Sequence, residues 1–233
     1  MKILVSTCLF GAAPIYTSGA LSFPKVLENE IPEARLRVYY DDTAPVDVIK
    51  TISAAPNCEC VDMTGRCFND IHRACWRFLA FEDATYDLVM SADIDGGKTH
   101  AFTITVLKNY LNHFEKERKP CVFAQIAPWI HGDYIPLIAA GAVIIYKGSY
   151  FFRNVEKTIL EFLKTYKSSS RKRKHQLGYG SDEIWLGNYL KSTIPSEELM
   201  IGQSLCRPQR SSTINNIRKM QIAFRNSKKN LCL

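Results

Sequence analysis

The chain has 233 residues, of which 46% are hydrophobic and 23% charged, a composition typical of a soluble globular protein with one large or two small domains. The net charge is +7, and residues 206–233 contain seven Lys or Arg and no acidic residue. The basic character therefore belongs to a tail and not to the fold. The apolar stretch 134–146 is too short to cross a bilayer, so we expect no transmembrane segment and a cytoplasmic protein.

The eight cysteines favour free thiols in a reducing compartment over a metal site or a disulfide framework. The central four have spacings that do not match the paired cysteines of zinc sites. These four are Cys58, Cys60, Cys67 and Cys75.

Apolar runs predict strands at residues 3–8, 36–40, 58–62, 86–91, 121–126 and 141–147. Helical patterns are expected at 24–30, after Pro45, after Asn69, at 101–118, after Asn154 and from Ser181 to Lys191, with 9–19 as a loop. Strands and helices alternate through residue 126, which predicts an α/β fold with a mainly parallel central sheet between helices. We expect one domain over residues 1–195, followed by a basic tail at 196–233 that is partly disordered or packed on the surface.

The stretch at residues 86–97 carries the clearest functional pattern. A short apolar run ends in Asp93 and Asp95, and Gly96 and Gly97 follow. Carboxylates two residues apart share one face of an extended chain, and the carboxyl edge of a parallel sheet is where such folds bind ligands. Two hard oxygen ligands beside an open loop suit Mg²⁺ or Mn²⁺ carrying phosphates, whereas the alternative is a D-x-D sequence that only caps a turn.

Three other clusters are candidates for the same edge of the sheet. They are Ser6 with Thr7 after the first strand, Arg73 with Arg77 on one helical face, and Asp182 with Glu183 in the first turn of a helix. The hydroxyls could bind a nucleoside, the arginines a diphosphate or the aspartates, and the acidic pair an acceptor hydroxyl. Each has a plain structural alternative: strand-end polarity, solvated arginines, or acidic residues that complement a helix dipole.

The order of these motifs resembles the GT-A type of glycosyltransferase, and most of all the compact enzymes encoded by large DNA viruses of algae. The resemblance covers about residues 1–190. It rests on Ser6 and Thr7, on the segments 39–42 (YYDD), 76–79 (WRFL) and 178–183 (GYGSDE), and on Asp93 and Asp95.

The resemblance implies a GT-A-like single domain, an α/β/α sandwich, that transfers a hexosyl or deoxyhexosyl group from a nucleotide sugar, a UDP-sugar above others, to a glycan or glycoprotein acceptor. Asp95 would be the main ligand of Mn²⁺ or Mg²⁺, and Asp93 would contact the metal or the ribose. Asp182 and Glu183 would be catalytic, facing the sugar or the acceptor hydroxyl. A viral origin would place the protein in the host cytoplasm. The residues expected to bind the nucleotide sugar are Ser6, Thr7, Asp41, Arg73, Arg77 and Asp93.

The chain departs from this pattern at Ala92 and Gly96, where relatives often have Arg and Ser. Two alternatives stay open. Residues 93–99 (DIDGGKT) resemble the loop of haloacid-dehalogenase-type phosphatases, in which Asp93 would be the nucleophile and Asp95 the acid or base. The basic tail could instead bind nucleic acid, although its single aromatic residue, Phe224, offers little for base stacking.

Overall fold

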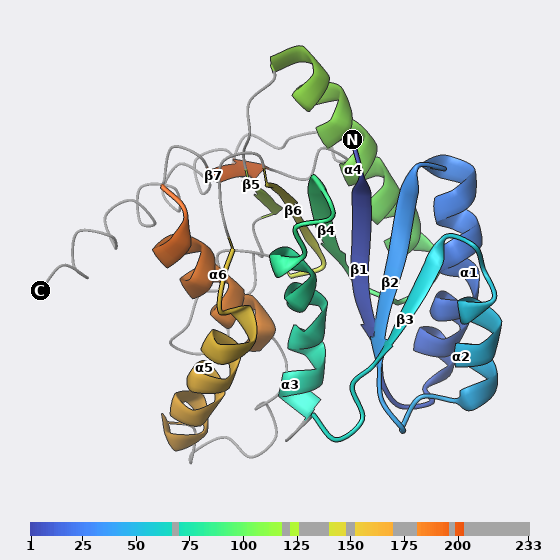
Figure 1. Cartoon of the computed structure of the whole chain (residues 1–233), viewed down its shortest axis with the longest axis horizontal. Helices are drawn as coiled ribbons and strands as arrows, with labels where there is room; N and C mark the ends of the chain where they lie inside the picture. The colour runs from blue at the N-terminus through green and yellow to red at the C-terminus, as the bar shows by residue number, and fades with distance from the viewer. Residues whose placement is uncertain are drawn as a thin grey trace, which may run out of the picture.

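A computed structural model of the chain describes residues 1–66, 70–117, 122–125, 140–147, 152–169, 181–195 and 199–202 (Figure 1). The strands are β1 Ile3–Leu9, β2 Ala34–Tyr40, β3 Cys58–Asp62, β4 Leu88–Ala92, β5 Val122–Gln125, β6 Ala142–Tyr146 and β7 Leu199–Gly202. The helices are α1 Pro14–Glu30, α2 Val46–Ser53, α3 Asp70–Cys75, α4 Lys98–Glu117, α5 Val155–Ser169 and α6 Ser181–Thr193, with a 3-10 helix, η1, at Trp76–Glu82.

The seven strands form one sheet in the order β3-β2-β1-β4-β6-β5-β7. β1 pairs in parallel with β2 and β4, β2 with β3, and β5 with β7. Only β6 runs against its neighbours β4 and β5. The predicted α/β class with a mainly parallel sheet is therefore confirmed, whereas the reversed direction of β6 and the presence of β7 were not foreseen.

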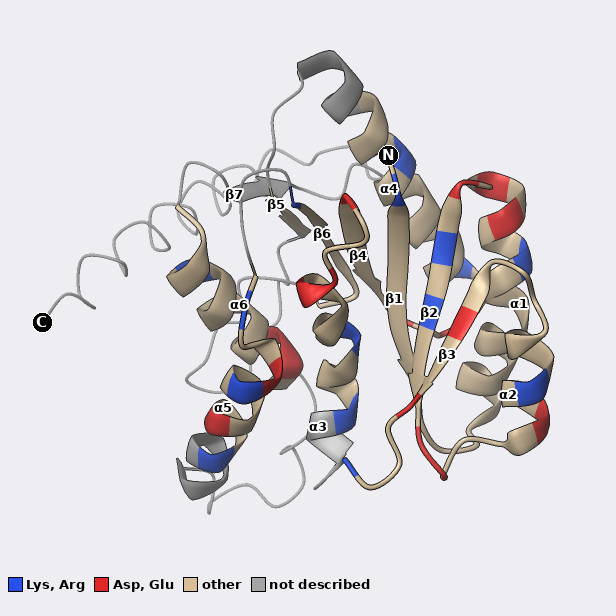
Figure 2. Cartoon of the chain, viewed as in Figure 1, with Lys and Arg blue, Asp and Glu red and all other residues tan. Residues whose placement is uncertain are grey.

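The central strands are uncharged, and charge appears only toward the β3 edge. β1 and β4 contain no Lys, Arg, Asp or Glu and are buried along their whole length. β2 contains Arg35 and Arg37, and β3 contains Glu59 and Asp62, so both strands carry charged residues (Figure 2). A strand covered on both faces is expected to carry no charged side chain, and β1 and β4 meet that requirement.

Helices cover both faces of the sheet. On one face, α1, α2 and α4 pack over side chains such as Val5, Leu36 and Ile144. On the other face, η1, α5 and α6 pack over Leu4, Val89 and Ile145. The alternation of Leu4 and Val5 between the two cores is the period-2 pattern of a strand, so β1 is the middle of an α/β/α sandwich.

The first helix is longer than the sequence pattern indicates. Residues 9–19 were expected to form a loop and a helix to begin at Pro24, but α1 begins at Pro14 and contains Pro24 in its interior. Pro14 occupies the first turn, where a missing N–H has no cost. Burial of Ala20, Phe23 and Leu27 at helical spacing then holds the helix together across Pro24.

The C-terminal end of the described chain adds a strand to the sheet. β7 lies within the range assigned to the tail from the sequence, so the sheet extends past residue 195. Residues 203–233 lie outside the described part. None of the described helices combines the length and apolar character that a bilayer crossing requires. Of the described cysteines, Cys8, Cys58, Cys60 and Cys75 are free thiols, as expected.

Candidate active site

The candidate site lies at the carboxyl ends of β1 and β4. From β1 the chain proceeds outward to β2 and β3, and it then returns to the other side of β1 to form β4. The strand order reverses at this point, and open α/β sheets bind ligands in the crevice that results. Asp93 and Asp95 follow β4 directly, so the D-x-D loop stands at the point where the topology predicts a ligand site.

Arg77 joins two of the acidic segments that the sequence singles out. This side chain from η1 is only 6% exposed. Its Nη1 forms an ion pair with Asp93 Oδ1 and also lies 3.3 Å from the carbonyl oxygen of Ala92. Its Nη2 lies 2.5 Å from Oδ2 of Asp182 at the start of α6. One guanidinium therefore fixes the D-x-D loop relative to α6, although Arg77 and Asp182 are 105 residues apart in the sequence.

The charges around Arg77 follow from these contacts. Burial disfavours the charged guanidinium, but Asp93 and Asp182 more than compensate and raise the pKa of Arg77 above its usual range. Asp95 differs from Asp93. In the described part of the chain it forms no ion pair, and burial together with the nearby Asp93 carboxylate raises the pKa of Asp95. Burial and Asp93 thus outweigh the attraction that Arg77 and His100 exert on the Asp95 carboxylate.

Two glycines let other elements approach the loop closely. A Cβ on Gly19 of α1 would overlap the carbonyl oxygen of Ile94 and lie 2.6 Å from the amide nitrogen of Gly96. A Cβ on Gly141, just before β6, would overlap the carboxylate of Asp93. The loop is thus enclosed by α1 on one side and by the start of β6 on the other.

Replacing Gly19 by alanine should destabilise the fold even though alanine favours helix formation. The added methyl group collides with backbone atoms that cannot rotate away, and overpacking of this kind costs about 1–3 kcal/mol. The matched control is Gly187→Ala in α6, where nothing lies within 4 Å of the new Cβ. That change should stabilise the protein by roughly 0.5–1 kcal/mol through helix propensity. Chemical denaturation of both variants measures the difference, and equal effects would contradict the close packing at Gly19.

A second network organises the neighbouring end of β2. Asp41 is buried, and its Oδ2 forms an ion pair with Nε of Arg73 at 2.8 Å. Its Oδ1 accepts hydrogen bonds from the backbone N–H and the hydroxyl of Thr43, at 3.0 and 2.5 Å. The Thr43 hydroxyl oxygen in turn accepts the N–H of Gly11 at 2.8 Å. The loops after β1 and β2 are therefore tied together, and the two predicted arginines serve different carboxylates.

The other predicted residues are positioned as follows. Ser6 is fully buried, and its hydroxyl donates to the carbonyl of Arg77 at 2.7 Å. Thr7 is also fully buried, and its Oγ1 has no hydrogen-bond partner in the described part. Asp182 is 8% exposed, and Glu183 beside it is half-buried. Residues 178–180 of the same motif lie outside the described residues.

The donor set at the loop fits a hard divalent cation that brings further ligands of its own. Among the described residues no cluster of three or more His, Cys, Asp or Glu side chains could hold a metal. At this loop, Asp95 offers a carboxylate with no ion-pair partner among the described residues. The side chain of Asp93, two residues away, is 45% exposed. Mg²⁺ and Mn²⁺ are commonly held by one or two carboxylates plus waters and substrate phosphates, so this pair is sufficient for such an ion.

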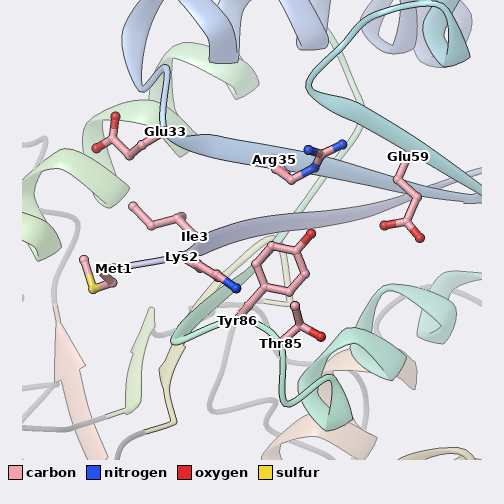
Figure 3. A pocket seen from close by; sticks show the side chains of 8 residues that line it. All are labelled: Met1, Lys2, Ile3, Glu33, Arg35, Glu59, Thr85 and Tyr86. Atoms are coloured by element: carbon pink, nitrogen blue, oxygen red, sulfur yellow. The ribbon is translucent and has the colours of Figure 1, made fainter.

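A pocket of about 520 Å³ lies at the opposite edge of the sheet. It is lined by side chains near the amino ends of β1, β2 and β4, among them Lys2, Glu33, Arg35 and Tyr86 (Figure 3). Cations and carboxylates are mixed there, and the D-x-D loop follows the other end of β4. This pocket is therefore separate from the candidate site.

Solved structures show which known fold this arrangement matches. A crystal structure of the galactosyltransferase LgtC in complex with donor and acceptor sugar analogues superimposes with a TM-score of 0.51 and 15% identity, over 87% of this chain and 73% of that chain. The fold is of the GT-A type. A structure of an active-site mutant of LgtC gives a TM-score of 0.53 and 14% identity, over 94% of this chain and 83% of that chain. No protein-family model and no curated protein sequence matches the chain.

Sequence reasoning missed three residues that pack around the loop. Gly19 ends the expected loop 9–19, Gly141 begins an expected strand, and His100 precedes the helix expected at 101–118, and none of the three was a candidate site residue. Their proximity to the loop arises from tertiary packing, which leaves no local signal in the sequence.

Proposed function

We propose that the chain is a glycosyltransferase that moves a hexosyl or deoxyhexosyl group from a nucleotide sugar to a hydroxyl of a glycan or glycoprotein. The expected donor is a UDP-sugar, and the expected metal is Mn²⁺ or Mg²⁺. The observation that carries the proposal is the D-x-D loop at the topological switch point, with Asp93 engaged by Arg77 and Asp95 free of any ion pair among the described residues. The shared fold with LgtC, a galactosyltransferase, supports it.

Each group at the edge of the sheet has a role in this proposal. Asp95 would hold the metal, which, when bound, would neutralise the charge that builds on the leaving diphosphate. Asp93, fixed by Arg77, would complete the ligand set or contact the ribose. Ser6, Thr7, Asp41 and Arg73 are proposed to shape the nucleoside side of the crevice.

Asp182 and Glu183 are the residues proposed to act on the sugar or the acceptor hydroxyl. Asp182 is bound to Arg77 at 2.5 Å, so its carboxylate is already engaged by a buried guanidinium. We therefore assign Asp182 a positioning role toward Arg77, and Glu183, half-buried in the same turn of α6, stays a candidate catalytic residue.

A panel of nucleotides tests the donor class directly. The unfolding midpoint should rise when Mn²⁺ is added together with UDP, because a ligand at one hundred times its dissociation constant stabilises the folded state by about 2.7 kcal/mol. GDP and CDP with Mn²⁺, UDP with EDTA, and Mn²⁺ alone are the controls. A shift with UDP and Mn²⁺ should be followed by slow release of UDP from UDP-sugars in the absence of acceptor. The absence of a shift with every nucleotide would overturn the proposal.

The same geometry disfavours the phosphatase alternative. It needs Asp93 as a free nucleophile, whereas Asp93 is paired with Arg77 and packed against Gly141. Hydrolysis of a simple phosphomonoester such as p-nitrophenyl phosphate, lost in Asp93→Asn, would favour it nonetheless. The basic tail that could bind nucleic acid lies outside the described residues.

A further inference from the structure

We infer that His100 is a positioning residue for the D-x-D loop: its imidazole, set between α1 and α4, holds the carbonyl of Ile94 and so fixes the directions in which Asp93 and Asp95 leave the backbone. The inference rests on the proposed function for the purpose of the loop. The contacts of His100 with Phe23 and with the Ile94 carbonyl are independent of the proposed function.

The ring of His100 is held in place on both its flat face and its edge. It is 2% exposed and stacks on Phe23 of α1, with ring centroids 4.1 Å apart and an interplanar angle of 12°. Its Nε2 lies 3.2 Å from the carbonyl oxygen of Ile94, within hydrogen-bond distance. A histidine so placed cannot turn without losing either the stack or the hydrogen bond.

The surroundings select one form of the imidazole. The Nε2 must carry the proton if it donates to a carbonyl, so Nδ1 of the neutral ring is an acceptor. The hydroxyl of Ser22 lies 3.5 Å from Nδ1 and 3.1 Å from the carbonyl oxygen of Gly19, and its single hydrogen can be donated to either of the two acceptors. Burial lowers the pKa of His100, although the Ile94 carbonyl and Asp95 oppose that shift, and this favours the neutral ring.

Holding the Ile94 carbonyl affects both aspartates because Ile94 lies between them. Its side chain is buried in the core under α1 and α4, and its carbonyl oxygen is the atom that a Cβ on Gly19 would strike. Side chains alternate along an extended segment, so a fixed Ile94 would direct the side chains of Asp93 and Asp95 away from this core, and Asp93 there meets Arg77. His100 and Gly19 thus secure the loop from the helix side while Arg77 secures it from the η1 side.

The bland alternative is a core histidine that only fills space. His100→Phe separates the two, since phenylalanine keeps a ring to stack on Phe23 but has no N–H for Ile94. His100→Gln is the rescue variant, because its amide nitrogen can donate from nearly the same place as Nε2. Thr103→Val is the matched control: Thr103 is fully buried on the same helix, and its hydroxyl has no hydrogen-bond partner in the described part.

The first measurement is Mn²⁺ binding with and without UDP. The electron paramagnetic resonance signal of free Mn²⁺ reports how much of the ion stays unbound. His100→Phe should weaken binding by about tenfold, as loss of a group that orients metal ligands commonly does. His100→Gln should recover most of the affinity, and Thr103→Val should bind as the wild type does. Unchanged Mn²⁺ affinity in His100→Phe would overturn the inference, whereas a wild-type protein that binds no Mn²⁺ would overturn the proposed function.

The second measurement needs no metal. Amide hydrogen exchange at residues 94–97 should be faster in His100→Phe than in Thr103→Val when the two are compared under conditions of equal global stability. Nitrogen-15 chemical shifts of the imidazole should show the Nε2–H tautomer in the wild type. Equal exchange in the two variants, or the other tautomer, would show that His100 does not hold the loop.

Discussion

Asp95→Asn should abolish metal-dependent binding of the nucleotide while leaving the fold at least as stable as the wild type. The carboxylate of Asp95 is partly buried beside Asp93 and forms no ion pair in the described part of the chain, so its charge is unfavourable in the absence of a metal. The amide has nearly the same shape and no charge, and it removes that repulsion. A residue that weakens the fold but serves the site is a common compromise in functional sites.

Two measurements on one variant decide this prediction. The Mn²⁺-dependent shift of the unfolding midpoint with UDP should disappear, and the midpoint without ligand should be unchanged or higher. Asp42→Asn is the control, because Asp42 lies at the same edge of the sheet but is exposed, and it should alter neither quantity. If Asp95→Asn keeps full Mn²⁺-dependent stabilisation, the assignment of Asp95 as metal ligand fails.

Arg77→Met should cost about 3–5 kcal/mol of folding free energy, the usual penalty for removing one partner from a buried ion pair. The change leaves Asp93 and the buried Asp182 facing each other without a cation between them. Because a domain is typically stable by only about 5–15 kcal/mol, the loss is a large fraction of the whole. Arg77→Lys should recover only part of it, since one ammonium cannot reproduce a planar fork that binds two carboxylates.

The cause can be isolated with a second substitution. Combining Arg77→Met with Asp182→Asn removes one of the unpaired carboxylates and should restore part of the lost stability, measured as a non-additive effect in urea unfolding. Arg35→Met is the control for loss of an arginine, because Arg35 is exposed at the opposite end of β2 and should change stability by less than about 0.5 kcal/mol. Strict additivity of Arg77→Met and Asp182→Asn would mean that the bridge carries no net coupling.

The sequence was most informative where the local pattern and the tertiary role coincide. Residues 88–97 combine an apolar run, two carboxylates and two glycines, and each feature has a direct structural counterpart at the end of β4. Arg77 was a candidate because it shares a helical face with Arg73 and lies in the segment 76–79 (WRFL), and it is buried between Asp93 and Asp182. Burial of a charge requires a partner, so this part of the site could be predicted from chemistry alone.

The rest depended on information that no local window contains. A helix was expected only from Pro24, but α1 begins at Pro14, and tertiary burial of the neighbours of Pro24 carries the helix through it. The reversed direction of β6 follows from where the chain re-enters the sheet, which the sequence of an apolar strand does not encode. Gly19 and His100 are recognisable only once α1 and α4 are known to flank the loop.

The pairing of β5 with β7 has a consequence for the way the protein is made. The two strands lie in parallel, with Val122 opposite Leu199, so the edge of β5 has no partner until the ribosome has passed residue 202. Contacts between segments this distant form late and slowly, and an unpaired strand edge can recruit the edge of another molecule in the meantime. A shortened version that removes the basic tail should therefore retain Gly202, so that the nascent sheet can be closed by its own chain.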